Sequence, residues 1–156
     1  MPNYYIFLSR PYPPAPVQRL LEQISRWIPD ADGITISGGK PFEQPEALIA
    51  LLSALRKRTS IDILVYSGYP IESLNLILSQ SSGMIDALIS DAFDLHSPHS
   101  RPLRGSDNQR LHMFTDLGRS KFGQYERELT KRDKSPALSF VGWSGPRRAM
   151  RADGEV

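Results

Sequence analysis

The segment with the clearest chemical potential is a pair of glycines at the end of an expected strand. The β-branched strand 33–37 ends at Ser37, and Gly38, Gly39 and Lys40 follow it. Glycines at such a point let the main chain turn sharply and approach a ligand closely. Ligands of parallel α/β sheets bind at the carboxyl ends of the strands. These four residues therefore form a candidate ligand-binding loop.

Two more loops are expected at the same edge. One starts at Ser67, after the expected strand 61–66, and the other at Asp91, after the expected strand 84–90. The three loops together favour a binding site over three unrelated turns. Side chains of Ser, Asp and Asn also commonly bond their own backbone in turns. Loop ordering is therefore an equally good interpretation of Ser67 and Asp91.

The chain has no cysteine at all. Disulfides, thiol catalysis and any zinc or iron–sulfur site ligated by cysteine of this chain are therefore excluded. The three histidines follow the fourth expected strand and are far apart from the glycine pair. We interpret His96, His99 and His112 as loop and surface residues rather than as metal ligands.

Charge is unevenly distributed along the chain. Residues 1–100 hold 7 Lys and Arg against 10 Asp and Glu, whereas residues 101–156 hold 12 against 7. The basic last third could meet phosphates or an acidic partner, or be a solvated surface. It lacks a clustered basic face with interleaved aromatics, so we expect no nucleic-acid partner.

No apolar run approaches the 18 or so residues of a membrane span, so no membrane association is expected. The first residues have neither a charged leader nor a small-residue cleavage site, which argues against a signal peptide. A cytoplasmic location is expected. The length of 156 residues suits one compact domain.

The loops are positioned by an alternation of strand-like and helix-like segments over the first 90 residues. Strand–helix alternation with short links predicts the α/β class, with a mostly parallel sheet flanked by helices. The expected strands are 3–8, 33–37, 61–66 and 84–90, and the expected helices are 17–28, 45–57 and 71–79.

After Asp91 the pattern changes. Residues 92–109 are polar and loop-like, and 111–115 are ambiguous between a strand and a turn. A charge-rich helix is expected at 118–132 and a last strand at 137–141. We divide the chain into an α/β domain, residues 1–133, and a basic tail, residues 134–156. The tail holds a turn signal, Asp153-Gly154, without a returning strand, as in a truncated chain.

Four segments carry a family resemblance, in order, between about residues 17 and 122. They read GITISGGKPFEQPEALIALLSALR, DILVYSGYPIESL, DALISDAFDL and RPLRGSDNQRLHMFT. Together they resemble the single-cluster radical S-adenosylmethionine (SAM) proteins, and most of all the activating proteins of anaerobic ribonucleotide reductase. The glycine pair followed at this distance by LRGSDNQRLH is a specific combination.

The resemblance implies a partial (β/α) barrel that holds a [4Fe–4S] cluster and SAM. In the family, a CxxxCxxC loop after the first strand binds the cluster, which cleaves SAM to a 5′-deoxyadenosyl radical. In the activating proteins this radical removes a hydrogen from a glycine of a partner enzyme. The resemblance assigns Ser67, Asp91, Asn108 and Gln109 to SAM contact and site closure.

This sequence departs from the family at two points. The expected first strand runs through a proline-rich link straight into helix 17–28, so the cysteine loop is missing. Lys40 stands where the family has a Glu that accepts a hydrogen bond from the SAM ammonium. Lysine offers donors only. Two cations about 4 Å apart also repel by about 1 kcal/mol in water.

Three function hypotheses follow. The first is a degenerate radical-SAM-like protein that binds no cluster and is inactive alone, as a fragment or half of a split protein. Its partner would be a glycyl-radical enzyme or a cysteine-bearing companion chain. The second is a non-catalytic module for a partner protein or an anionic ligand, the anion held by Lys40 and glycine amides. The third is an enzyme whose cluster another chain completes. We expect neither SAM nor a cluster in this chain alone.

Overall fold

The computed structural model describes residues 5–8, 16–38 and 40–126. The expected strand 137–141, the boundary between residues 133 and 134, and the basic tail all lie outside these residues. So does the site residue Gly39.

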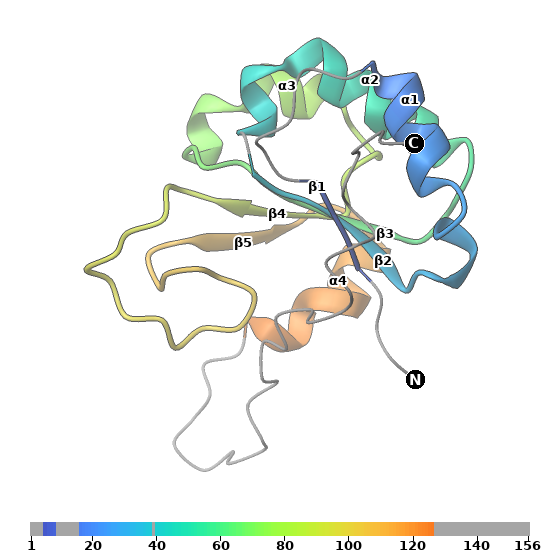
Figure 1. The fold of residues 1–156 in the computed structure, drawn as a ribbon. Coiled ribbons are helices and arrows are strands. Elements are labelled where there is room, and N and C mark those ends of the chain that lie inside the picture. Colours follow the sequence, from blue (N-terminus) through green and yellow to red (C-terminus); the bar gives the residue numbers. More distant parts are fainter. Residues whose placement is uncertain (1–4, 9–15, 39, 127–156) are drawn as a thin grey trace, which may run out of the picture.

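The described part is built on one open five-stranded sheet (Figure 1). The strands lie in chain order, and the first four run parallel to one another, as predicted. The segment that the sequence left ambiguous forms the fifth strand, which pairs antiparallel with the fourth. The strands are β1 (Tyr5–Leu8), β2 (Gly33–Ile36), β3 (Asp62–Tyr66), β4 (Ala87–Ser90) and β5 (Arg110–Met113).

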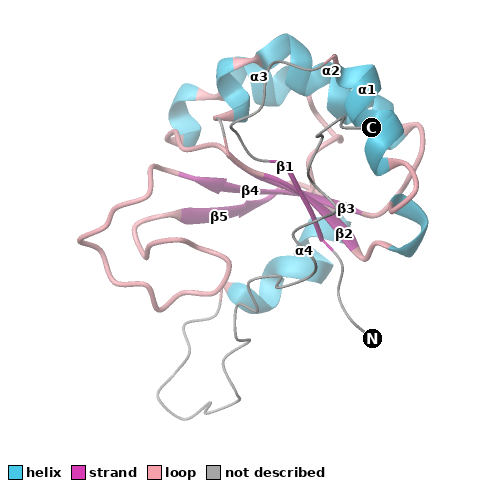
Figure 2. Ribbon diagram, in the orientation of Figure 1, coloured by secondary structure: helices cyan, strands magenta, loops and turns pink. Residues whose placement is uncertain are grey.

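Helices cover both faces of the sheet. Three of them, α1 (Val17–Ile24), α2 (Pro45–Arg56) and α3 (Asn75–Gln80), lie on one face, and α4 (Asp116–Phe122) lies on the other (Figure 2). The α/β class and the flanking helices are therefore confirmed. Within the described residues, no helix has the length and apolarity needed to cross a bilayer.

Three expected helices differ from their predicted bounds. The helix expected at 118–132 begins at Asp116 and ends at Phe122 as α4, and its expected residues 127–132 lie outside the described part of the chain. Helix α1 ends at Ile24 rather than 28, and a 3₁₀ turn follows at Ile28–Asp30. Pro29 has no N–H for the next helical bond, so the α-helix cannot continue through it. The expected helix 71–79 is split into a 3₁₀ turn at Ile71–Ser73 and α3. Buried Leu74 lies between the two pieces.

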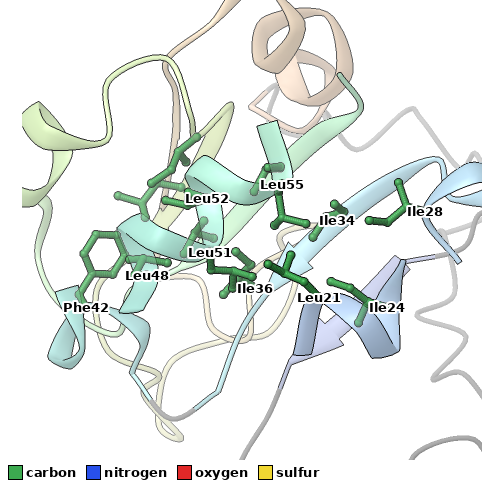
Figure 3. Close-up of a cluster of buried hydrophobic side chains, with 14 of the residues drawn as sticks. Leu21, Ile24, Ile28, Ile34, Ile36, Phe42, Leu48, Leu51, Leu52 and Leu55 are labelled. Atoms are coloured by element: carbon green, nitrogen blue, oxygen red, sulfur yellow. The ribbon is translucent and has the colours of Figure 1, made fainter. Parts of the chain in front are cut away.

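Two apolar clusters hold the layers together. Along β3, Ile63 and Val65 face the larger cluster and Leu64 faces the smaller one, because side chains alternate between the faces of a strand. The smaller cluster packs beneath α4 and consists of Leu64, Ala87, Ile89, Leu111 and Phe122. The larger cluster (Figure 3) consists of Leu21, Ile24, Ile28, Ile34, Ile36, Phe42, Leu48, Leu51, Leu52, Leu55, Ile63, Val65, Leu74, Ile85 and Leu88.

The buried carboxylate of Asp86 joins four elements at the opposite edge of the sheet from the loops. It accepts hydrogen bonds from the backbone N–H of Ile63 at 2.8 Å and from the hydroxyl of Thr115. It also pairs with the guanidinium of Arg56 at the end of α2. Arg56 in turn donates to two backbone carbonyls, at 2.7 and 3.0 Å. Helices α2 and α4 are thereby tied to β3 and β4.

Removing this carboxylate should be costly. In Asp86→Ala the Arg56 guanidinium and the Ile63 N–H lose their common partner. Breaking a buried ion pair from one side costs about 3–5 kcal/mol, and we expect a loss of that size in the free energy of unfolding measured with urea. The matched control is Asp116→Ala, whose fully exposed carboxylate pairs with Arg119 on the surface. A control that loses as much as Asp86→Ala would contradict the role of Asp86.

Helix α4 approaches the sheet closely at one glycine. A Cβ added at Gly118 would lie 2.2 Å from the backbone oxygen of Asp86, whereas one added at Gly123 would have nothing within 4 Å. We expect Gly118→Ala to lower the free energy of unfolding by about 1–3 kcal/mol through overpacking. Gly123→Ala should leave it equal or higher. Equal stability of the two variants in urea titrations would refute this contact.

Candidate functional site

The three expected loops meet at the carboxyl ends of the parallel strands. The backbone N–H of Ser67 donates to Ile89 O at 3.0 Å, and that of Asp91 donates to Tyr69 O at 2.8 Å. The phenol of Tyr69 donates to Glu43 in the glycine-pair loop. The loops after β2, β3 and β4 are therefore bonded to one another side by side.

Backbone strain is concentrated in the same loops. Among the described residues, three other than glycine have positive φ, namely Lys40 at 48°, Asp91 at 74° and Leu103 at 66°. Gly38, at 78°, takes the conformation that a glycine allows without cost. Strained residues tend to cluster at ligand clamps and active sites, so the strain supports a functional role for this edge.

Lys40 does not face the edge as an isolated positive charge. Its ammonium lies 3.4 Å from a carboxylate oxygen of Glu43 and 5.2 Å from the centre of the Tyr69 ring. Hydrogen bonding to Glu43, and then to Tyr69, raises the pKa of Lys40. The pair carries no net charge. Binding of an anion by Lys40 and glycine amides stays a prediction, and the pairing of Lys40 with Glu43 gives it less support.

Ser67 uses its hydroxyl within its own turn. The side chain is buried, donates to Tyr69 O at 2.7 Å and accepts from the Tyr69 N–H at 3.1 Å. This geometry fits the loop-ordering interpretation. Ser37 directly follows β2 and is half-buried. A role of Ser67 or Ser37 in SAM contact remains a prediction.

Asp91 belongs to a charge cluster that sequence reasoning missed. The guanidinium of Arg110, at the start of β5, donates to Asp91 at 2.7 and 3.1 Å and to Glu72 at 2.8 and 2.9 Å. These hydrogen bonds lower the pKa of Glu72 to about 2 and lower that of Asp91 as well. Both carboxylates are therefore charged near neutrality, and the cluster fixes β5 against the loops after β3 and β4.

His112 is not the loop or surface residue that the sequence suggested. It lies half-buried in β5, with Nε2 2.8 Å from the hydroxyl of Ser90. That hydroxyl donates to Asp91 at 2.7 Å, so the His112 Nε2–H donates to it. Burial lowers the pKa of His112. Ser90 is fully buried, so the hydrogen-bonded set of His112, Ser90 and Asp91 cannot present the serine hydroxyl to a substrate as a nucleophile.

Asn108 and Gln109 hold the long loop between β4 and β5. Asn108 donates to Ala92 O at 2.8 Å, and Gln109 donates to Asp91 O at 3.1 Å. The side-chain oxygen of Gln109 accepts from the N–H groups of Gly105 and Ser106, at 2.8 and 3.2 Å. Both side chains thus serve loop order in this structure. Their proposed contact with SAM is still a prediction.

Buried Arg104 anchors the other end of this loop to the segment after α4. Its guanidinium donates to Gln109 O at 2.8 Å and to Tyr125 O at 3.3 Å, and it pairs with Glu126. Nearby, the phenol of Tyr66 donates to Leu103 O, and burial raises its pKa to about 12. These contacts hold the loop against β3 and the segment after α4.

Comparison with known proteins places this arrangement in a family. The family described as "4Fe-4S single cluster domain" matches residues 8–112, which include all three loops. The anaerobic ribonucleoside-triphosphate reductase-activating protein of Enterobacteria phage T4 is 31% identical over 87 residues, 54% of either chain. The chain thus spans about half the length of this relative. No solved structure matches. The family match covers two thirds of the chain's residues. The chain therefore belongs to the 4Fe-4S single cluster domain family.

Proposed function

We propose that this chain is a radical-SAM-like protein that assembles no [4Fe–4S] cluster of its own and starts no radical chemistry alone. Its role is to bind a partner protein through the loops at the carboxyl edge of the sheet. The observation that carries the proposal is the absence of cysteine from all 156 residues of a family member.

The chain's own donors do not fit the cluster. Iron–sulfur clusters are held by cysteine thiolates, in some cases with histidine. Within the described ranges, no three His, Asp or Glu side chains gather closely enough to hold a metal ion. His96 and His99 are exposed, and His112 is bonded to Ser90. The described residues therefore offer no set of ligands for a [4Fe–4S] cluster.

The partner-binding half of the proposal rests on the long loop between β4 and β5, which extends beyond the sheet (Figure 2). Its backbone is fixed, yet Phe93 is 57% exposed and Leu95 is 72% exposed. Exposed apolar side chains that lie together on a surface mark protein-interaction sites, and these two are only two positions apart in the loop. The relative is named as activating anaerobic ribonucleoside-triphosphate reductase. The proposed partner is a glycyl-radical enzyme of that kind, or a companion chain that carries cysteines.

The cluster-free state can be tested directly. After anaerobic reconstitution with iron and sulfide, the purified chain should retain neither in stoichiometric amount, because it has no thiolate to hold them. Iron and sulfide analysis with visible absorbance is the measurement, and the activating protein of phage T4 treated in parallel is the positive control. A stoichiometric cluster on the isolated chain would overturn the proposal.

The partner surface can be tested with matched leucines. Leu95 and Leu76 are each 72% exposed, but Leu76 lies on α3 and not on the loop between β4 and β5. We expect Leu95→Ser to weaken binding to anaerobic ribonucleoside-triphosphate reductase by about tenfold, because truncation of one of the few residues that dominate an interface costs more than about 1 kcal/mol. Leu76→Ser should bind like the native chain. No binding by the native chain in surface-plasmon measurements, or equal loss in both variants, would refute this partner surface.

A further inference from the structure

A buried carboxylate lies at the start of β3, on the face of the sheet that α4 covers. Asp62 is the first residue of this strand, and only 4% of its side chain is exposed. Its register partner on β2 is Gly33, and a Cβ added there would lie 2.5 Å from Asp62 Oδ2. The carboxylate therefore fills the space that a side chain at Gly33 would take.

The charge of Asp62 is poorly compensated for its burial. The ammonium of Lys121 on α4 lies 3.8 Å from Asp62 Oδ1, and the Lys121 side chain is 50% exposed. An ion pair this long and this open to water offsets little of the cost of taking a carboxylate out of water. Arg56 also attracts the charge of Asp62, and Asp86 repels it. Burial outweighs the two attractive charges, so the pKa of Asp62 is raised.

The packing of α4 also bears on the long loop between β4 and β5. Just after α4, Tyr125 O accepts a hydrogen bond at 3.3 Å from Arg104 of that loop. Arg104 also pairs with Glu126. A change in how firmly α4 packs on the sheet is therefore passed on to the loop.

We propose that Asp62 is a pH switch for α4 and, through α4, for the long loop between β4 and β5. When the Asp62 carboxylate takes up a proton, α4 packs more firmly on the sheet, and when the proton leaves, α4 opens more often. The proposal goes beyond the proposed function, because it holds with or without a protein partner.

The direction of the switch follows from what α4 does to the carboxylate. Packed α4 keeps the charged carboxylate from water, and opening of α4 returns it to water. The packed state therefore has the higher pKa and binds a proton more readily than the open state. By linkage, the free energy that holds α4 in place is lowest above the raised pKa, where Asp62 is charged. It rises as the pH falls through the raised pKa and is fully gained below the ordinary pKa of an aspartate.

The test measures how often α4 opens. The N–H of Arg119 donates to Thr115 O at 3.0 Å within α4, and its hydrogen exchange is followed by NMR. Between about pH 7 and about pH 4, after correction for intrinsic exchange, we expect its protection in the native chain to rise severalfold. Protection of the Gly105 N–H in the loop should rise with it. In Asp62→Asn, protection at neutral pH should exceed that of the native chain, and the rise should be absent.

Lys121 provides a second variant, and Asp32 provides a matched control. Lys121→Met removes an attractive charge, so it should lower the protection of α4 at neutral pH in the native chain but not in Asp62→Asn. Asp32→Asn, which removes an exposed aspartate just before β2, should behave like the native chain.

Three outcomes would overturn the switch. They are a carboxyl ¹³C signal of Asp62 that titrates within or below the ordinary range of aspartates, a rise in protection that survives in Asp62→Asn, and equal effects of Lys121→Met in both backgrounds. A rise at Arg119 without one at Gly105 would overturn the link between α4 and the loop.

Discussion

The fold depends on the buried carboxylate of Asp86, which links helices from both faces of the sheet to its central strands. Its bonds to Arg56, Ile63 and Thr115 connect α2, β3 and α4 at the edge where the parallel strands begin. The apolar clusters on the two faces lack direction by themselves, because hydrophobic burial is not directional. The ion pair and hydrogen bonds of Asp86 fix the positions of α2 and α4 relative to the sheet. The positions of the strands in turn set where the loops at the opposite edge lie.

At the far edge, charged groups are paired instead of being left open. Arg110 pairs with both Asp91 and Glu72, which leaves one net negative charge in that cluster, and Glu43 pairs with Lys40. The three loops lie bonded side by side at this edge, and the chain has no thiolate that could hold an iron–sulfur cluster there. The loop between β4 and β5 also exposes the apolar side chains of Phe93 and Leu95.

Much of this architecture could be predicted from the sequence, because apolar periodicity marked the strands and helices, and parallel strands bring their following loops to one edge. Side-chain pairing could not be predicted. Arg110 meets Glu72 across 38 positions, and that contact depends on the antiparallel register of β5. The strict alternation in RLHM was the available signal for β5, since it places Arg110 and His112 on one face. Glu43 was overlooked as the partner of Lys40, although it stands only three residues away.

The return of β5 beside β4 brings both ends of the long loop to one place. Ser90 pairs with Arg110 in the register of the two strands, and the Arg110 guanidinium donates a hydrogen bond to Asp91, the first residue of the loop. The closure entropy of a loop with fixed ends grows slowly, by about 0.6 kcal/mol for each doubling of its length. The mostly exposed residues 92–100 can therefore change in length or sequence at little thermodynamic cost to the sheet, whereas Arg104 and Gln109 are buried and bonded to other parts of the fold. Because such changes disturb the sheet little, this exposed segment is where sequence divergence can most easily change what the protein recognises.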